Sequence, residues 1–285
     1  MATQTFDAAF RTSGTQEQLL VSKDVIQSES RCKARRFFVI TSVAEPFQNA
    51  ATLLSTDARN LGLQSTIIDV TALREHHLLL GGRFETTLFY FLTNSPEIPS
   101  IVPGLLLNGH TVINAQFYGL ALSKPRVQCL LRARGWRVPD MIYPASASQL
   151  THPDFTQRLS FPLFVKSVRH FHFTHEVRTA QALADTIESI SVADEFYVEA
   201  AVNSKDTELR RFYVVGDAVH DSAGIVRDSA LCHYASSLGR VLGLDVYSLE
   251  AFVGSAPPVC IDVNPASALY VSAQARARLC ERALA

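Results

Sequence analysis

The sequence predicts an α/β (α+β) fold in which a small open α/β domain precedes a larger region of further strands and helices. Two observations support this fold class. The chain has 285 residues, of which 47% are hydrophobic, so it can bury a substantial core and hold two or three subdomains. Short apolar runs also alternate with segments of helical spacing along most of the chain.

The N-terminal part divides into an extension and a small α/β domain. Residues 1–35 are expected to be a partly ordered extension, and residues 36–112 form the domain. Its first strand, Phe37–Ser42, is apolar and rich in β-branched residues, as in a buried parallel strand. The order then predicts a helix and two more strands: Pro46–Leu63, Gln64–Val70 and Thr87–Leu92.

The rest of the chain is divided at residue 195, into 113–195 and 196–285. The sequence predicts helices at Arg126–Arg134, Val177–Ile190 and Ser229–Leu244. It predicts strands at Phe161–Lys166, Glu195–Val202 and Leu209–Val215, followed by two strands near the C-terminus.

Composition argues against several classes of protein. A formal net charge of −1 gives no bulk electrostatic reason to bind nucleic acid or an anionic membrane. No segment has about 18 uninterrupted apolar residues, and the N-terminus lacks the apolar core of a secretory signal. Scattered cysteines without paired spacing argue against a zinc site or a disulfide framework and favour a reducing cytoplasm: Cys32, Cys129, Cys232, Cys260 and Cys280.

A pair of acidic positions near the C-terminus is the most informative feature. Glu250 opens an apolar run, and Asp262 and Asn264 close the next run after a Gly-Ser-Ala-Pro-Pro turn. Two strands joined by a short turn would place Glu250 opposite Asp262 and Asn264, which share one face. Carboxylate and amide oxygens are hard ligands that suit Mg²⁺ bound together with nucleotide phosphates. We therefore expect a metal site here.

The order of these pieces from about Asn114 to Asn264 resembles the ATP-grasp superfamily, in the carboxylate–amine ligase branch of glutamate ligases and glutathione synthetase. In that resemblance, 36–112 is the pre-ATP-grasp domain, 113–195 the central and lid subdomain, and 196–285 the C-terminal catalytic subdomain. The segment Val112–Ala115 with Ser123-Lys124 and Gly135–Pro139 looks like the family's opening signature.

By that match two lysines contact the phosphates of ATP. Lys124 stands before the second helix of the signature, although an exposed lysine at a helix start is the simpler alternative. Lys166 ends the apolar strand Phe161–Lys166, where an anion such as a phosphate would compensate a desolvated ammonium group.

Two further segments match the family. Tyr197–Val202 resembles the hinge strand that receives adenine, which implies cofactor-binding roles for Glu199, Ala200 and Val202. Glu208 or Asp206 would then bind the ribose. Leu209–Asp217 resembles the family's Asp-x-Arg strand, with Leu209 in place of the Asp.

Arg211 matches the arginine of that strand. The resemblance implies that it stabilises the transferred phosphoryl group, so that Arg211 and Lys166 are the catalytic candidates. A surface ion pair with Glu208 or Asp206 is the alternative.

The match at Glu250, Asp262 and Asn264 implies a ligand set for Mg²⁺ or Mn²⁺, with the two acid types exchanged relative to the family. The largest departure is Ser167–His175, which has no glycine where the family has a glycine-rich loop. Arg169 and the histidines could replace backbone donors there, or catalysis could be lost.

Together these matches imply an ATP-dependent carboxylate–amine ligase that forms an amide or peptide bond through an acyl-phosphate and releases ADP and phosphate. Its partners would be small-molecule or peptide acids and amines, and a homodimer is common in this fold. Two alternatives stay open: a small-molecule kinase like the inositol-phosphate kinases, and a degenerate nucleotide-binding protein without catalysis.

Overall fold

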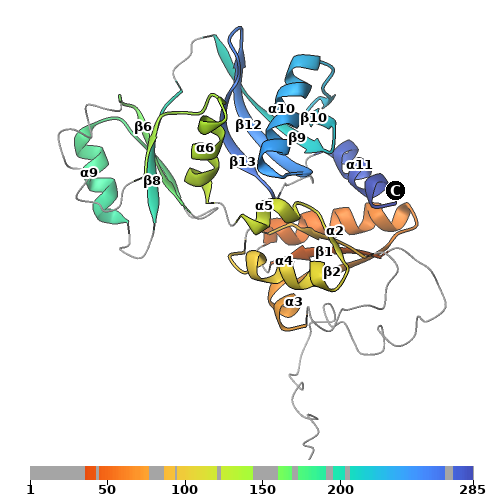
Figure 1. The fold of residues 1–285 in the computed structure, drawn as a ribbon. Helices are drawn as coiled ribbons and strands as arrows, with labels where there is room; N and C mark the ends of the chain where they lie inside the picture. The colour runs from red at the N-terminus through yellow and green to blue at the C-terminus, as the bar shows by residue number, and fades with distance from the viewer. Residues whose placement is uncertain are drawn as a thin grey trace, which may run out of the picture. The chain divides into compact units, whose positions relative to one another are not determined.

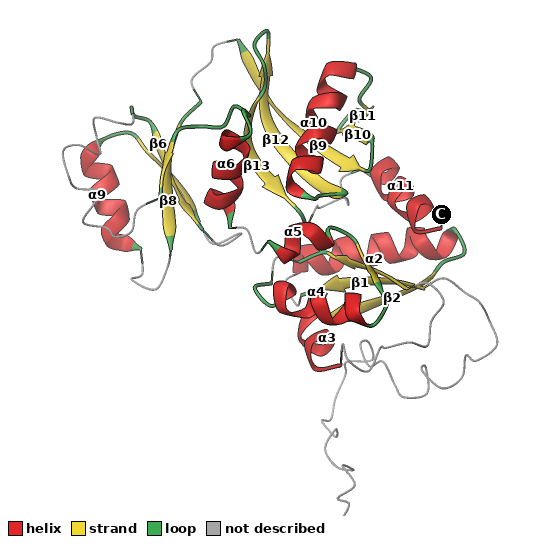
Figure 2. Cartoon of the chain, in the orientation of Figure 1, coloured by secondary structure: helices red, strands yellow, loops and turns green. Residues whose placement is uncertain are grey.

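Three sheets organise the chain (Figure 1 and Figure 2). The structure is a computed structural model that describes residues 36–42, 45–76, 87–93, 95–120, 123–143, 160–168, 173–190, 195–202, 206–266 and 272–284. The predicted extension, residues 1–35, and residues 169–172 of the glycine-poor loop lie outside this part. None of the described helices is long and apolar enough to cross a membrane.

The first sheet is parallel, as the buried apolar strand at Phe37–Ser42 predicted, and its strand order is β2-β1-β3-β4. The central strand, β1, is buried over most of its length because it is apolar on both faces. The strands are β1 (Arg36–Thr41), β2 (Gln64–Asp69), β3 (Thr87–Phe91) and β4 (Thr111–Val112), and the helices are α2 (Glu45–Asn60), α3 (Val70–His76), α4 (Ile98–Leu107) and α5 (Ala115–Gly119).

The second sheet is antiparallel, in the order β5-β8-β6-β7. Its strands are β5 (Met141–Ile142), β6 (Leu163–Ser167), β7 (Thr174–Val177) and β8 (Phe196–Ala200). One face packs against helix α9 (Ala180–Ser189) through a small core that includes Leu163, Val198 and Leu183. Strand β8, which follows the expected boundary at residue 195, pairs with β5 and β6 in this sheet.

The predicted start of the helix at Val177 is corrected by the structure. Val177 is the last residue of β7, and α9 begins at Ala180. Thr179 caps this helix, since its hydroxyl accepts a hydrogen bond of 3.1 Å from the backbone N–H of Ala182.

The third sheet has the order β11-β10-β9-β12-β13, and all its pairs are antiparallel. The elements of this region are α6 (Lys124–Ala133), β9 (Thr207–Val215), β10 (Ala218–Asp221), β11 (Gly224–Ile225), α10 (Ser229–Leu242), β12 (Val246–Gly254), β13 (Val259–Asn264) and α11 (Ala273–Leu284).

The first and third sheets share their cores. One cluster joins Phe89 of β3 and Leu131 of α6 to Leu249 of β12 and Leu238 of α10. A second cluster contains residues of β1 and α2 together with Val246 and residues of α11. Helix α6, expected in the central subdomain, therefore packs against the third sheet and brings its N-terminus to β13.

Candidate functional site

The pairing of β12 with β13 places two predicted metal ligands side by side. Glu250 is in register with Asp262, which confirms the pairing that the hairpin pattern predicted. The register then shifts, so that Ala251 pairs with Cys260 and Ile261 is the extra residue of a β-bulge. Cys260 consequently lies in the buried core with Ala251, whereas Asp262 shares the opposite face with Glu250.

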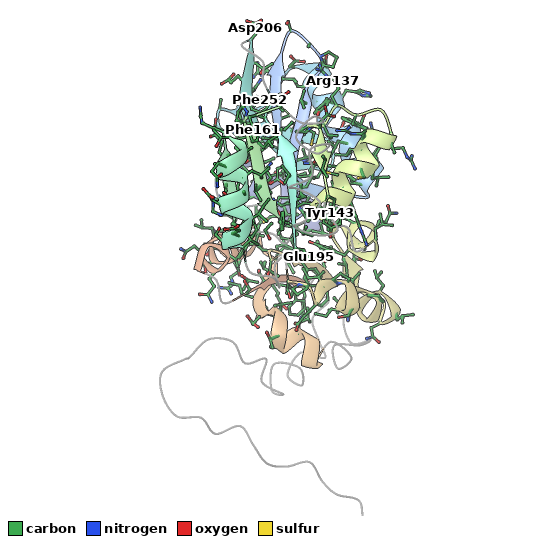
Figure 3. The ribbon with its side chains drawn as sticks, turned by 90° about the vertical axis from the view of Figure 1, so that its left-hand side faces the viewer. Arg137, Tyr143, Phe161, Glu195, Asp206 and Phe252 are labelled. Carbon is green, nitrogen blue, oxygen red and sulfur yellow. The ribbon has the colours of Figure 1, made fainter. Side chains whose placement is uncertain are left out.

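The site face of the third sheet carries three cross-strand rows. Arg211, Glu250 and Asp262 are in register and form the charged row. Tyr213, Ser248 and Asn264 form the row on one side, and Leu209, Phe252 and Val259 form an apolar row on the other. Figure 3 labels Phe252 in this apolar row. The charged row is thus bordered by polar groups on one side and apolar groups on the other.

Each carboxylate of the charged row is paired with a cation. Lys124 Nζ lies 3.1 Å from Asp262 Oδ1. Arg211 donates from Nε to Glu250 Oε1 at 2.7 Å, and its Nη2 also contacts that oxygen. Burial lowers the pKa of Arg211, but its bonds with Glu250 and Tyr213 outweigh this effect and raise the pKa overall. The guanidinium therefore stays charged.

A second, more deeply buried ionic network surrounds Glu199 of β8. Glu199 is 2% exposed, and its Oε1 lies 2.6 Å from Lys166 Nζ while its Oε2 accepts a 2.7 Å hydrogen bond from Gln128 Nε2. Lys166 and Glu199 are diagonal neighbours on adjacent strands. Phe164 is in register with Glu199, and the Lys166 ammonium group lies over its ring, 5.7 Å from the ring centre. A carboxylate this buried requires such compensation.

Gln128 is a site residue that the sequence reasoning missed. It stands one helical turn after Lys124 on α6, and side chains four apart lie on the same helix face. That spacing was the available signal. A small hollow beside it is lined by Lys124, Val127, Gln128, Leu131, Cys260, Ile261, Asp262 and Val263.

The carboxylates lie close enough together to influence neighbouring groups. Burial raises the pKa of Cys260, and Asp262, Glu199 and Glu250 raise it further. Burial also raises the pKa of Tyr197, as do Glu199 and Asp262. Both side chains therefore remain protonated.

Asn114, which opens the sequence signature, connects the start of β12 with the end of β13. Its Nδ2 donates to the carbonyl of Val246 at 2.6 Å and of Pro265 at 3.2 Å. Its Oδ1 accepts from the N–H groups of Asp245 at 2.8 Å and Val246 at 3.0 Å. One buried amide thus fixes both the start of β12 and the turn directly after Asn264.

The donor set fits a hard divalent cation. Glu250 and Asp262 provide carboxylates, and Asn264 provides an amide oxygen that also accepts from the N–H of Ala266 at 3.1 Å. The described part of the chain contains no group of three His, Cys, Asp or Glu side chains able to hold a metal. A site here therefore depends on the amide and on groups brought by a ligand.

Three residues predicted to bind the nucleotide lie outside the charged row: Glu208, Ala200 and Val202. Glu208 is in register with Val253, which packs into the core shared with α10, so Glu208 lies on the face opposite Arg211. The ribose contact expected of Glu208 or Asp206 stays a prediction. The N–H of Ala200 donates to the carbonyl of Asp140 at 2.7 Å, and Val202 follows the end of β8.

No family model matches the chain, and no curated protein does. Solved structures do match. A RimK-domain ATP-grasp protein from Sphaerobacter thermophilus has a TM-score of 0.67 at 16% identity, covering 87% of this chain and 100% of its own. The chain has the ATP-grasp fold.

Two ligases with this fold support the same conclusion. The ATP-grasp ligase PsnB, in complex with its precursor peptide PsnA2 and AMPPNP, gives a TM-score of 0.64 at 14% identity over 88% of this chain and 96% of its own. D-alanine–D-alanine ligase from Bacillus anthracis, in complex with ATP, gives a TM-score of 0.66 at 17% identity, and the match covers 88% of this chain and 97% of the ligase. The ATP-grasp fold thus accounts for nearly all of the described chain.

Proposed function

We propose that the protein is an ATP-dependent carboxylate–amine ligase that forms an amide or peptide bond through an acyl-phosphate. One observation carries the proposal: in an ATP-grasp fold, the row Arg211–Glu250–Asp262 lies next to Lys124, with Lys166 linked to it through Glu199 and Gln128 on α6. Such a mixture of cations and oxygen ligands suits a nucleotide bound together with a metal.

Each group has a proposed role. Lys124, Lys166 and Arg211 bind phosphate oxygens, and Glu199, Ala200 and Val202 form the adenine end of the site. The apolar row formed by Leu209, Phe252 and Val259 offers a surface for the base. Mg²⁺ or Mn²⁺ would be held by Glu250, Asp262 and Asn264, where it would neutralise charge between the β- and γ-phosphates.

The reaction then proceeds in two displacements. A substrate carboxylate oxygen attacks the γ-phosphorus, the bond from phosphorus to the β–γ bridging oxygen breaks, and ADP leaves. An amine nitrogen next attacks the acyl carbon, phosphate leaves, and the amine loses a proton. Arg211 and Lys166 would stabilise the negative charge on the transferred phosphoryl group. An acyl-phosphate is already activated, so no strong protein base is required.

The substrates proposed are small-molecule or peptide acids and amines, in keeping with the precursor peptide bound by PsnB. A cytoplasmic location and a homodimer, both expected from the sequence, are proposed on the same basis. Leu209 in place of an acid and Glu208 on the opposite face favour a second candidate, a nucleotide-binding protein without catalysis.

The experiment is an ADP-release assay with panels of acids and amines, in which products are identified by mass spectrometry. A ligase releases ADP over many turnovers only when acid and amine are both present, since the amine is needed to discharge the acyl-phosphate, and Arg211→Ala abolishes this turnover. A phosphorylated hydroxyl product would identify a kinase instead. MgATP binding without turnover on any panel would support the binding-only protein.

A further inference from the structure

Among the described residues, the proposed site balances its charges in pairs. Lys124, Lys166 and Arg211 are each bonded to a carboxylate, namely Asp262, Glu199 and Glu250 respectively. The groups proposed to bind phosphate are therefore occupied by site carboxylates, and two of those carboxylates are the proposed metal ligands.

These pairs differ in how easily they open. Lys124 and Asp262 are 22% and 31% exposed, and Arg211 and Glu250 are 55% and 22% exposed. Exposed pairs of this kind contribute about 0–1 kcal/mol each, so a ligand can displace them at little cost. The side chains of Lys166 and Glu199 are only 16% and 3% exposed, and Gln128 holds the carboxylate as well. That pair is expected to persist when nucleotide binds, with the phosphate contacts made by the other N–H groups of the Lys166 ammonium.

A nucleotide that enters without metal meets an unfavourable exchange. Phosphate oxygens would take Lys124 and Arg211 from Asp262 and Glu250, and would leave both carboxylates uncompensated beside the phosphate charge. A metal that enters without nucleotide faces the opposite problem. It would displace Lys124 and Arg211 from the two carboxylates and leave these cations without anions. When both enter together, every displaced charge finds a new partner.

Building on the proposed function, we propose that the pairs Lys124–Asp262 and Arg211–Glu250 form an electrostatic gate that admits only the complex of divalent metal and nucleotide. The site then discriminates against metal-free nucleotide by repulsion as well as by missing contacts. Metal and nucleotide are two ligands with a positive coupling free energy, and each raises the affinity for the other by the same factor.

The gate predicts an effect on ATP binding that the simple loss of a metal ligand would not produce. Neutralising a metal ligand should strengthen binding of metal-free ATP, because it removes a competing anion from a phosphate-binding cation. In calorimetric titrations with EDTA present, Asp262→Asn should bind ATP up to about fivefold more tightly than the wild-type chain, the factor set by losing one exposed competing pair. Glu250→Gln is the second variant, and it acts through Arg211 in the same direction.

The mirror experiment uses Mn²⁺ alone as a spectroscopic probe. Lys124→Gln should bind Mn²⁺ more tightly than wild type in the absence of nucleotide, because Asp262 loses its competing ammonium group. Asp140→Asn is the matched control: it breaks an exposed ion pair of 2.9 Å with Arg132 of the same helix, and it keeps the backbone carbonyl of residue 140 that accepts from the N–H of Ala200. This control should change neither the affinity for metal-free ATP nor the affinity for Mn²⁺ alone.

The outcomes separate the gate from the proposed function. If wild type binds MgATP but Asp262→Asn and Glu250→Gln bind metal-free ATP no more tightly than wild type, the gate is wrong and the function stands. If wild type does not bind MgATP in the same calorimeter, both are wrong. Tighter metal-free binding in both variants, with Asp140→Asn unchanged, supports the gate.

Discussion

Asn114 supports a quantitative prediction about stability. Its side chain makes four hydrogen bonds, of which two reach the fully buried residue Val246. Asn114→Ala removes all four and leaves buried backbone groups unsatisfied, at about 1–3 kcal/mol for each such group. With some relaxation, we expect a loss of about 3 kcal/mol in the free energy of unfolding.

The backbone of Asn114 allows the contribution of these bonds to be separated from strain. Asn114 has φ = 61°, a left-handed conformation that costs a residue with an ordinary side chain about 1–2 kcal/mol and glycine almost nothing. Asn114→Gly removes the same hydrogen bonds without this strain. The loss in the free energy of unfolding should therefore be smaller for Asn114→Gly than for Asn114→Ala by about 1 kcal/mol, after allowance for the flexibility of glycine in the unfolded chain.

The assay is equilibrium unfolding in urea, with the transition followed by circular dichroism and fluorescence. A loss below about 1 kcal/mol for Asn114→Ala would refute the reasoning, because the four bonds would then contribute almost nothing. Binding of MgATP should weaken in parallel, since the amide fixes β12 and the turn after Asn264.

Three further predictions concern the third sheet and α6. Burial and Arg278 lower the pKa of His220 below 6.5 although Asp221 raises it, so the unfolded chain binds a proton more readily than the folded chain. Stability should fall as the pH drops through about 6.5. In urea unfolding, His220→Leu should lose less free energy of unfolding between about pH 8 and about pH 5.5 than the wild-type chain does, and equal losses in the two proteins would contradict this. Deleting Ile261 removes the bulge and should misplace either Cys260 or Asp262, so MgATP binding in calorimetry should disappear; unchanged affinity would contradict the role of the bulge. Gln128→Leu removes one donor from buried Glu199 and should lower the free energy of unfolding by about 1–3 kcal/mol, measured in urea, whereas Gln181→Leu, which removes an exposed hydrogen bond to Asp185, should not.

The sequence predicted the elements of the site better than their orientation. Apolar runs with a turn between them were enough to pair Glu250 with Asp262. Strict alternation, however, would place Cys260 and Asp262 on one face, and only the bulge separates them. Such a one-residue shift leaves no trace in hydrophobic periodicity.

Glu208 shows the same difficulty at the other end of the site. Its chemistry suited a ribose contact, but which face it occupies depends on the register of β9 with β12. The two bonds of the network, Lys166 to Glu199 and Gln128 to Glu199, join residues 33 and 71 positions apart through tertiary packing. Only Lys166 and Glu199 were therefore recognised, each through the resemblance. The shared core of the first and third sheets was likewise invisible to local patterns.

The most direct test of the central claim is the thermal stability of the wild-type chain with and without MgATP, beside Lys166→Ala and Asp262→Ala. A ligand that binds only the folded state stabilises it by about 2.7 kcal/mol at a hundred times its dissociation constant. We predict a magnesium-dependent rise in the wild-type melting temperature that both variants lose. No rise in wild type at millimolar MgATP would contradict the assignment of a nucleotide site to this row of residues.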